Sequence, residues 1–334
     1  MSYDWAFYEK IAESARRSAH EVVPIILDYI SPRSVIDVGC GTGTWLSVFS
    51  SKGVTDFLGV DAESVPMGLL EIPVSRYVTF DLSIPFSYAR RFDLVVSLEV
   101  AEHLPSQIAH SFVESLVRLG PAVLFSAAIP GQGGTCHINE QWPTYWSELF
   151  ARHSYVPVDF LRRKVWCNPQ VSWWYSQNMI LFCAREYLNQ NRALMEEFKS
   201  SGQPLPLVHP RKLAELDWNY KTEKAARELR NLIRTDAAFI LVDNGKTLDV
   251  FENYPFAIPF PEHEGEFNGA PPNDRVALAE FERLRTNAEY LVVLHSAFDW
   301  LTYYPQWYSA IRTSCKLLSL SECLMVYDVQ KEHE

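Results

Sequence analysis

Short apolar runs alternate with amphipathic stretches over the first half of the chain. Five runs have the length and composition of buried strands: Val35–Val38, Phe57–Val60, Tyr77–Phe80, Leu94–Leu98 and Ala122–Ala127. Apolar residues recur at helical spacing from Trp5 to about Tyr29 and again from Gln107 to Arg118. Strands that alternate with helices predict a parallel sheet with helices on both faces.

Two further strand candidates lie close together after these runs. They are Tyr155–Phe160 and Ser176–Cys183, and no helix long enough for a crossover between parallel strands separates them. We therefore expect an antiparallel pair at the edge of the sheet.

A second, smaller α/β pattern closes the chain. From Leu188 to about Arg230 the sequence is polar, helical and interrupted by prolines, which is typical of a connector. Beyond it lie three buried-strand candidates and one helical run: Ala238–Asp243, Tyr290–His295, Leu324–Val329 and the helix Asp274–Thr286.

The chain is long enough, at 334 residues, for two domains with buried cores. We expect a first domain over residues 1–187, a helical connector over 188–230 and a small α/β domain over 231–334. The 41 acidic and 30 basic residues give a formal net charge of -11. This charge repels polyphosphate, so a nucleic-acid partner is not expected. The oligomeric state is left open, with a homo-oligomer as one option.

The cysteines and the apolar runs favour a cytoplasmic protein. The six cysteines are scattered and form no CxxC pair, unlike a disulfide framework or a zinc ribbon, so we expect reduced thiols. The N-terminal stretch MSYDWAFYEKIAESARR is polar and charged, and no later stretch is apolar over the length that a membrane helix needs. We expect neither an export signal nor a membrane span.

The loop after the first strand, in SVIDVGCGTGTWLSVF (Ser34 to Phe49), carries three glycines at alternate positions. Glycine there permits positive φ and lets a ligand touch the backbone at the carboxyl edge of the sheet. A dinucleotide loop requires glycine or alanine where this chain has Thr44. Thr44, and the lack of a Tyr-x-x-x-Lys helix at the expected place, disfavour a nucleotide-sugar oxidoreductase and leave S-adenosylmethionine as the better candidate ligand.

The pattern D-V-G-C-G-T-G, with Asp37 two residues before the first glycine, resembles motif I of class I S-adenosylmethionine-dependent methyltransferases. The resemblance continues in LGVDAE, in VTFDLS and in FDLVVSLEVAEHL. It implies a Rossmann-like, seven-stranded methyltransferase sheet and S-adenosylmethionine as the cofactor. It also implies that Asp61 holds the ribose hydroxyls and that Asp81 and Leu82 lie beside the adenine. The cofactor-binding residues that it implies are Asp37, Gly39, Gly41, Gly43, Asp61, Asp81, Leu82 and Glu99.

Carboxylates near a sulfonium favour the cation and bind hydroxyls, which agrees with this interpretation. The alternative is that Asp37 and Asp61 only cap helices or turns.

The stretch GQGGTCHINEQWPTYWSELF (Gly131 to Phe150) follows the fifth strand. It gathers polar and aromatic candidates for substrate binding: Asn139, Glu140, Gln141 and Trp142. Together with WWYSQNMILF (Trp173 to Phe182), it resembles a methyltransferase subgroup associated with polysaccharide and glycosylated natural-product gene clusters. Side-chain amides, carboxylates and indole rings suit a sugar. We therefore expect O-methylation of a saccharide or a glycosylated intermediate, with a small molecule as the broader option.

Methyl transfer to a hydroxyl requires alignment of the nucleophile and removal of its proton. His137 and His103 are the candidate bases, and either is alternatively a structural histidine. Five side chains offer ligands for a divalent metal: Glu99, Glu102, His103, His137 and Glu140. Their spacing does not demand a metal, so a metal-free site is the expectation.

The last part of the chain resembles a poorly characterised module found beside glycosyltransferases and methyltransferases in cell-surface polysaccharide proteins. Its aromatic block after the strand at Tyr290–His295, which includes Trp300 and Trp307, favours either a carbohydrate-binding surface or an aromatic seam packed against the first domain or a second chain. Two other functions stay open for the whole chain. One is a non-catalytic scaffold that keeps the methyltransferase fold, and the other is N- or C-methylation.

Overall fold

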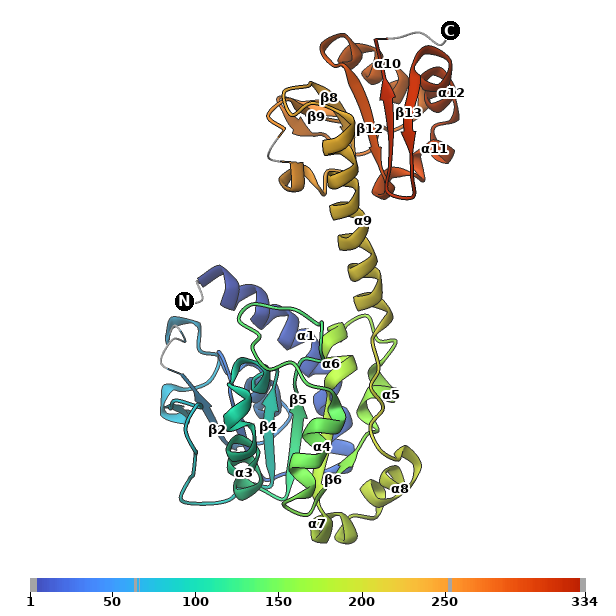
Figure 1. Cartoon of the computed structure of the whole chain (residues 1–334). Helices are drawn as coiled ribbons and strands as arrows, with labels where there is room; N and C mark the ends of the chain where they lie inside the picture. Colours follow the sequence, from blue (N-terminus) through green and yellow to red (C-terminus); the bar gives the residue numbers. More distant parts are fainter. Residues whose placement is uncertain (1–4, 63–64, 66, 252–253, 331–334) are drawn as a thin grey trace. The chain divides into compact units, whose positions relative to one another are not determined.

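The computed structural model (Figure 1) describes residues 5–62, 65, 67–251 and 254–330, and the chain divides into two compact units, Met1–Lys212 and Leu213–Glu334. Each unit has a main sheet and an apolar core of its own. The predicted α/β class, with a second and smaller sheet, is confirmed.

The first unit is built on a seven-stranded sheet in the order β3-β2-β1-β4-β5-β7-β6. Its strands are β1 (Ser34–Val38), β2 (Asp56–Asp61), β3 (Tyr77–Thr79), β4 (Leu94–Leu98), β5 (Ala122–Ser126), β6 (Tyr155–Val158) and β7 (Ile180–Ala184). The first five are parallel, and β7 runs antiparallel to both β5 and β6. The expected antiparallel pair at the sheet edge is confirmed.

Helices cover both faces of this sheet, as the alternating pattern predicts. Successive strand residues point to opposite faces, so Val35 and Ile36 belong to different apolar cores. The helices α1 (Trp5–Tyr29), α2 (Thr44–Ser51) and α5 (Leu161–Val165) pack on the Val35 face. On the Ile36 face lie α3 (Ala109–Leu119) and α4 (Pro143–Ala151), which Figure 1 shows in front of the strands.

The predicted strand Ser176–Cys183 is wrong in its first half. Residues Trp173–Asn178 form a short helix, α6, and the strand β7 begins only at Ile180. The side chains of Gln177 and Asn178 are buried and bond to Gln132. These tertiary hydrogen bonds satisfy the polar groups, and the apolar run that remains is long enough only for β7.

The segment 188–230 contributes to both units. It begins in α7 (Arg185–Gln190) and continues through α8 (Arg192–Ser201) into α9 (Pro210–Leu232). Leu188 and Leu194 are buried in the core of the first unit, and Leu229 is buried in a core of the second.

The second unit has a five-stranded sheet in the order β13-β14-β12-β8-β9. Its elements are β8 (Phe239–Val242), β9 (Ala257–Pro259), β12 (Tyr290–Leu294), β13 (Lys316–Leu320) and β14 (Leu324–Asp328), with the helices α10 (Asp274–Leu284), α11 (Trp300–Tyr303) and α12 (Pro305–Ser314). A separate two-stranded hairpin joins β10 (Glu262–His263) to β11 (Glu266–Phe267).

Neither interpretation of the aromatic block holds for its two tryptophans. Trp300 and Trp307 are buried in the core of the second unit itself, and Trp307 stacks on Phe260 with ring centroids 5.6 Å apart. The short helices α11 and α12 carry these rings back onto the sheet, which removes them from any surface.

The six cysteines are free thiols. Among the described residues, no helix combines the length and the apolar character needed to cross a membrane.

Candidate active site

The central strand β1 lies between β2 and β4, so the carboxyl ends of these three strands are neighbours. Asp37 lies near the end of β1, Asp61 ends β2, and Glu99 directly follows β4. The chain leaves β1 for β2 on one side, whereas β4 and β5 lie on the other side. Such a reversal of strand order opens a crevice for ligands at the carboxyl edge of an α/β sheet.

The first glycine of the loop after β1 is held tightly. Gly39 has φ +84°, and its N–H donates to the carbonyl oxygen of Val60 at 2.7 Å. A Cβ at this position would lie 2.2 Å from a methyl carbon of Val100. Only glycine therefore fits at residue 39 without movement of its neighbours.

The second glycine is open by contrast. Gly41 has φ +53°, and a Cβ there would meet nothing within 4 Å. Its N–H donates to Oδ2 of Asp61 at 2.6 Å. Gly43, with φ +82°, directly precedes α2 and packs against Ile72. The loop thus presents bare backbone at Gly41, between two positions fixed by packing.

Asp37 and Asp61 are carboxyl groups whose ionisation the fold disfavours. Burial raises the pKa of Asp37 well above its ordinary range, and the charge of Asp61 raises it further. Burial also raises the pKa of Asp61, opposed by the hydrogen bonds from the N–H groups of Gly41 and Ala62. A cation bound between the two carboxyls would stabilise their ionised forms. This pair therefore suits a positively charged ligand.

Sequence reasoning missed Glu71, which supports the glycine loop. Its carboxylate accepts hydrogen bonds from the hydroxyls of Thr44 and Ser47, and its N–H donates to the carbonyl oxygen of Thr42 at 2.8 Å. Arg16 of α1 pairs with the same carboxylate at 2.9 Å. The available signal was a lone acid within the apolar stretch LLEIP.

Asp81 and Leu82 follow β3, the edge strand beside β2. Asp81 is exposed, and a hydrogen bond with Ser83 lowers its pKa. Leu82 is buried in the apolar core on the α3 face. Both predicted residues therefore follow the strand next to β2, with Asp81 in solvent and Leu82 in the apolar core.

Glu99 adopts φ +55°, an uncommon backbone conformation for a residue other than glycine. Its N–H donates to Ser126 of β5, and its carboxylate accepts from Asn178 at 3.1 Å and from Gln132 at 3.1 Å. Burial raises its pKa, opposed by these hydrogen bonds. Glu99 is thus held at the rim by groups that sequence reasoning did not assign to the site.

A second group of side chains lies beside this rim. Glu102 and His103 come from the turn after β4, and His137 comes from the loop after β5. The rings of His103 and His137 lie edge to face, with centroids 4.9 Å apart and planes at 84°. Burial lowers the pKa of His103, and His137 lowers it further, so a neutral imidazole is favoured.

The backbone of Glu102 ties the two loops together. Its carbonyl oxygen accepts the N–H groups of Ile138 at 2.9 Å and of Asn139 at 3.0 Å. Burial raises the pKa of the Glu102 carboxyl well above its ordinary range, and the charge of Glu99 raises it further. The structure thus brings the candidate bases His103 and His137 together with Glu102, and the carboxyl of Glu99 lies next to Glu102.

Glu140 joins this cluster from the same loop as His137. Its Oε1 lies 3.0 Å from Nδ1 of His137 and accepts the N–H of Gly133 at 2.7 Å. Its Oε2 accepts the N–H of Gly131 at 2.8 Å. Glu140 therefore orients the histidine and fixes the loop, although the sequence suggested substrate binding.

The other predicted substrate residues have internal contacts. Asn139 is buried, donates to the carbonyl oxygen of Ala101 at 3.4 Å and accepts from Gln141 at 3.1 Å. Trp142 is half-buried and directly precedes α4. Asn139 and Gln141 thus stabilise the loop, and Trp142 lies where the loop enters the helix.

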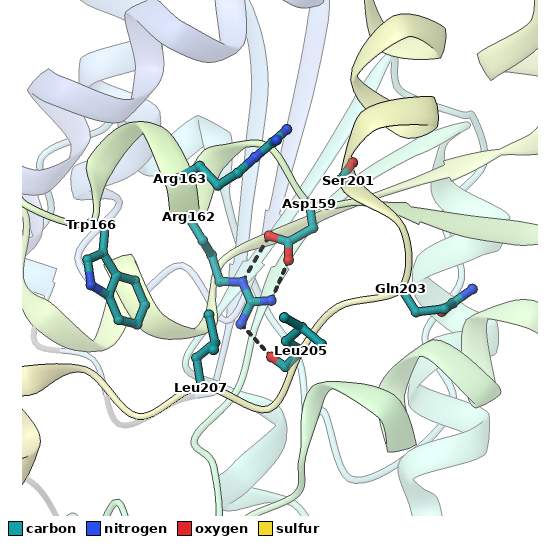
Figure 2. A pocket seen from close by; sticks show the side chains of 8 residues that line it. All are labelled: Asp159, Arg162, Arg163, Trp166, Ser201, Gln203, Leu205 and Leu207. Carbon is teal, nitrogen blue, oxygen red and sulfur yellow. Dashed lines mark hydrogen bonds and ion pairs between the residues drawn. The ribbon is translucent and has the colours of Figure 1, made fainter.

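A separate cavity of about 190 Å³ lies elsewhere in the first unit (Figure 2). Its lining residues are Asp159, Arg162, Arg163, Trp166, Ser201, Gln203, Leu205 and Leu207. The buried guanidinium of Arg162 bonds to the carboxylate of Asp159 and donates to the carbonyl oxygen of Leu205 at 3.0 Å. The buried charges of this cavity, those of Arg162 and Asp159, already pair with each other. None of the residues predicted for the site lines the cavity.

Residues 9–165 match a protein family described as a methyltransferase domain. No curated protein matches the sequence.

Three solved structures align with part of the chain. An S-adenosylmethionine-bound amino pentose methyltransferase of calicheamicin biosynthesis from Micromonospora echinaspora is 15% identical, and the alignment covers 55% of this chain and 98% of that chain with a TM-score of 0.41. The magnesium protoporphyrin IX methyltransferase of Synechocystis PCC 6803 is 16% identical, with 55% and 86% covered and a TM-score of 0.39. An O-methyltransferase family protein from Burkholderia thailandensis is 10% identical, with 55% and 60% covered and a TM-score of 0.41.

Proposed function

We propose that this S-adenosylmethionine-dependent methyltransferase, whose residues 9–165 match the methyltransferase-domain family, methylates a hydroxyl group of a saccharide or of a glycosylated intermediate. The observation that supports the cofactor assignment is the buried carboxyl of Asp37 and the partly buried carboxyl of Asp61, next to the open backbone of Gly41.

The residues at the rim fit the cofactor. Burial disfavours the ionised forms of Asp37 and Asp61, and a nearby cation would favour them. The cofactor carries two cationic groups, a sulfonium and an ammonium. Gly41 leaves room for the ligand to approach the backbone. When bound, S-adenosylmethionine supplies an electrophilic methyl group. Asp61 would accept hydrogen bonds from the ribose hydroxyls, and the loop around Gly39 and Gly41 would hold the methionine part.

The cluster of His103, His137 and Glu140 is the proposed acceptor side. Because Nδ1 of His137 faces Glu140, its Nε2 is the nitrogen left to take the proton of an acceptor hydroxyl. The lowered pKa of His103 favours its neutral form, so a second possible base lies beside His137. A half-buried indole at Trp142 and the exposed loop over residues 133–136 suit the polar and apolar faces of a sugar.

The test begins with cofactor binding to the full chain, measured by calorimetry. We expect saturable binding of S-adenosylmethionine, and we expect labelled methyl groups to appear on at least one member of a panel of sugar nucleotides and glycosides. Nuclear magnetic resonance of the product then shows whether oxygen, nitrogen or carbon carries the methyl group. Absence of cofactor binding would favour the non-catalytic scaffold.

His137→Ala separates chemistry from cofactor binding. We expect loss of turnover with nearly unchanged cofactor affinity, because His137 lies on the loop after β5 and Asp61 lies on β2. The matched control is His110→Ala, which removes an exposed histidine of α3. Equal turnover in the His137 variant and the wild type would remove His137 from the mechanism.

A further inference from the structure

Three possible metal ligands from two loops converge beside the rim. Glu102 and His103 follow β4, and His137 follows β5. One ligand atom from each of the three lies within 4.8 Å of the other two. The hydrogen bonds from Ile138 and Asn139 to the Glu102 carbonyl oxygen hold the two loops at this separation.

Glu102 is the unusual member of the group. Its side chain is 0% exposed, and no described N–H or O–H group donates a hydrogen bond to either carboxylate oxygen, although the carboxyl of Glu99 lies close enough to interact with it. Nδ1 of His103 is likewise buried without such a partner in the described part of the chain. An unpaired buried carboxyl lowers stability, and buried charges are normally paired or coordinate metals. The fold therefore keeps a costly group aimed at two imidazoles.

We propose that Glu102, His103 and His137 form a binding site for a divalent transition-metal ion. Two imidazoles and one carboxylate suit Zn²⁺, Mn²⁺ or Fe²⁺ better than Mg²⁺, which prefers oxygen ligands. Glu140 supplies the outer support that such sites use, because it faces Nδ1 of His137 and leaves Nε2 for the ion. The spacing of these residues along the sequence does not demand a metal, so the proposal rests on their tertiary arrangement.

Three protein ligands leave positions open for an acceptor. This part of the inference rests on the proposed function. An ion at the site would contact the acceptor hydroxyl and make it more acidic. The acceptor oxygen then forms its bond to the methyl carbon, the carbon–sulfur bond breaks with its electron pair left on sulfur, and the hydroxyl proton passes to water. His137 acts here as a ligand in place of a base.

The test uses the full chain after removal of metal with a chelator. Zn²⁺, Mn²⁺ and Mg²⁺ are added separately, and bound metal is measured by equilibrium dialysis with elemental analysis. We expect one equivalent of Zn²⁺ or Mn²⁺ and at least about tenfold weaker binding of Mg²⁺. Glu102→Gln and His137→Ala should each weaken binding by about tenfold or more.

Two variants serve as controls. His110→Ala removes an exposed histidine of α3, and Cys136→Ser removes the exposed thiol beside His137. Both should bind metal as the wild type does. Loss of binding in Cys136→Ser would assign the ion to the thiol and overturn the proposed ligand set. Circular dichroism and thermal unfolding establish that each variant is folded.

The two proposals fail in different ways. Absence of stoichiometric Zn²⁺ and Mn²⁺ binding, or equal binding in both ligand variants and the wild type, would overturn the metal site. Absence of S-adenosylmethionine binding to the same metal-free protein would overturn the proposed function and leave the metal site standing. Full turnover in chelator-treated protein would retain His137 as the base and exclude the ion from the reaction.

Discussion

Nδ1 of His137 lies 3.0 Å from Oε1 of Glu140, and the same carboxylate accepts the N–H groups of Gly131 and Gly133. One acid therefore orients the histidine and shapes the loop that carries it. Both roles of His137, as a base and as a metal ligand, depend on this contact, because it decides which ring nitrogen is free.

Glu140→Gln should lower kcat by about 10- to 100-fold, with cofactor affinity unchanged. The amide offers one oxygen where the carboxylate offers two, so at least one of Gly131, Gly133 and His137 loses its acceptor. Steady-state kinetics and calorimetry check the two parts. Glu148→Gln, on the exposed side of α4, is the matched control. An unchanged kcat would show that Glu140 does not position His137.

Asp61→Asn should weaken S-adenosylmethionine binding by about 10- to 100-fold, since a hydrogen bond to a charged group contributes about 1.5–3 kcal/mol. Each oxygen of Asp61 accepts one backbone N–H at 2.6 Å, from Gly41 and from Ala62, and an amide can accept only one of them. Calorimetry measures the dissociation constant. The comparison is Asp81→Asn at the exposed position after β3, where we expect a smaller effect. An equal loss at both positions would contradict a special role for Asp61.

Gly39→Ala should lower the free energy of unfolding by more than Gly41→Ala does. At Gly41 the cost is that of a positive φ, about 1–2 kcal/mol. At Gly39 the added methyl group also meets Val100 at 2.2 Å. Urea unfolding measures both. Adding Val100→Ala to Gly39→Ala should recover part of the difference, as measured against Val100→Ala alone. Equal destabilisation by the two glycine variants would argue against the packing contact.

The stability of the ligand-free protein should fall as pH rises because of Asp37. Burial raises its pKa in the folded state above the unfolded value of about 3.9. The folded chain therefore binds more protons than the unfolded chain between these two values. The contribution of Asp37 to stability is complete below the unfolded pKa and is lost as pH rises through the folded pKa.

Asp37→Asn removes this titration. Relative to the wild type, the variant should become more stable as pH increases over the same interval, as measured by urea unfolding at a series of pH values. It should also bind S-adenosylmethionine more weakly, because the cation loses a carboxylate partner. A constant difference in stability across all pH values would contradict the raised pKa.

Local patterns of apolar residues predicted most strands of the seven-stranded sheet and fewer of the five-stranded one. Leu94–Leu98 was predicted with the bounds that the structure gives it, because a fully buried strand is an uninterrupted apolar run. The edge strand Lys316–Leu320 was missed. Most of its residues are exposed, so its sequence has neither a buried run nor a clear alternation.

The sequence alone determined the five parallel strands of the first sheet, the glycine loop after β1, and the acids near the ends of β1 and β2, because each depends on residues adjacent along the chain. The tertiary structure decided what those residues meet. Glu71 accepts a hydrogen bond from a hydroxyl of α2, and Asn178, which precedes the antiparallel strand β7, donates to Glu99. Candidate ligand atoms of Glu102 and His137 lie within 4.8 Å of each other because the parallel strands β4 and β5 bring their carboxyl ends to one edge. The number of residues between two side chains does not predict such contacts, because the contacts depend on how the helices and loops pack against the sheet.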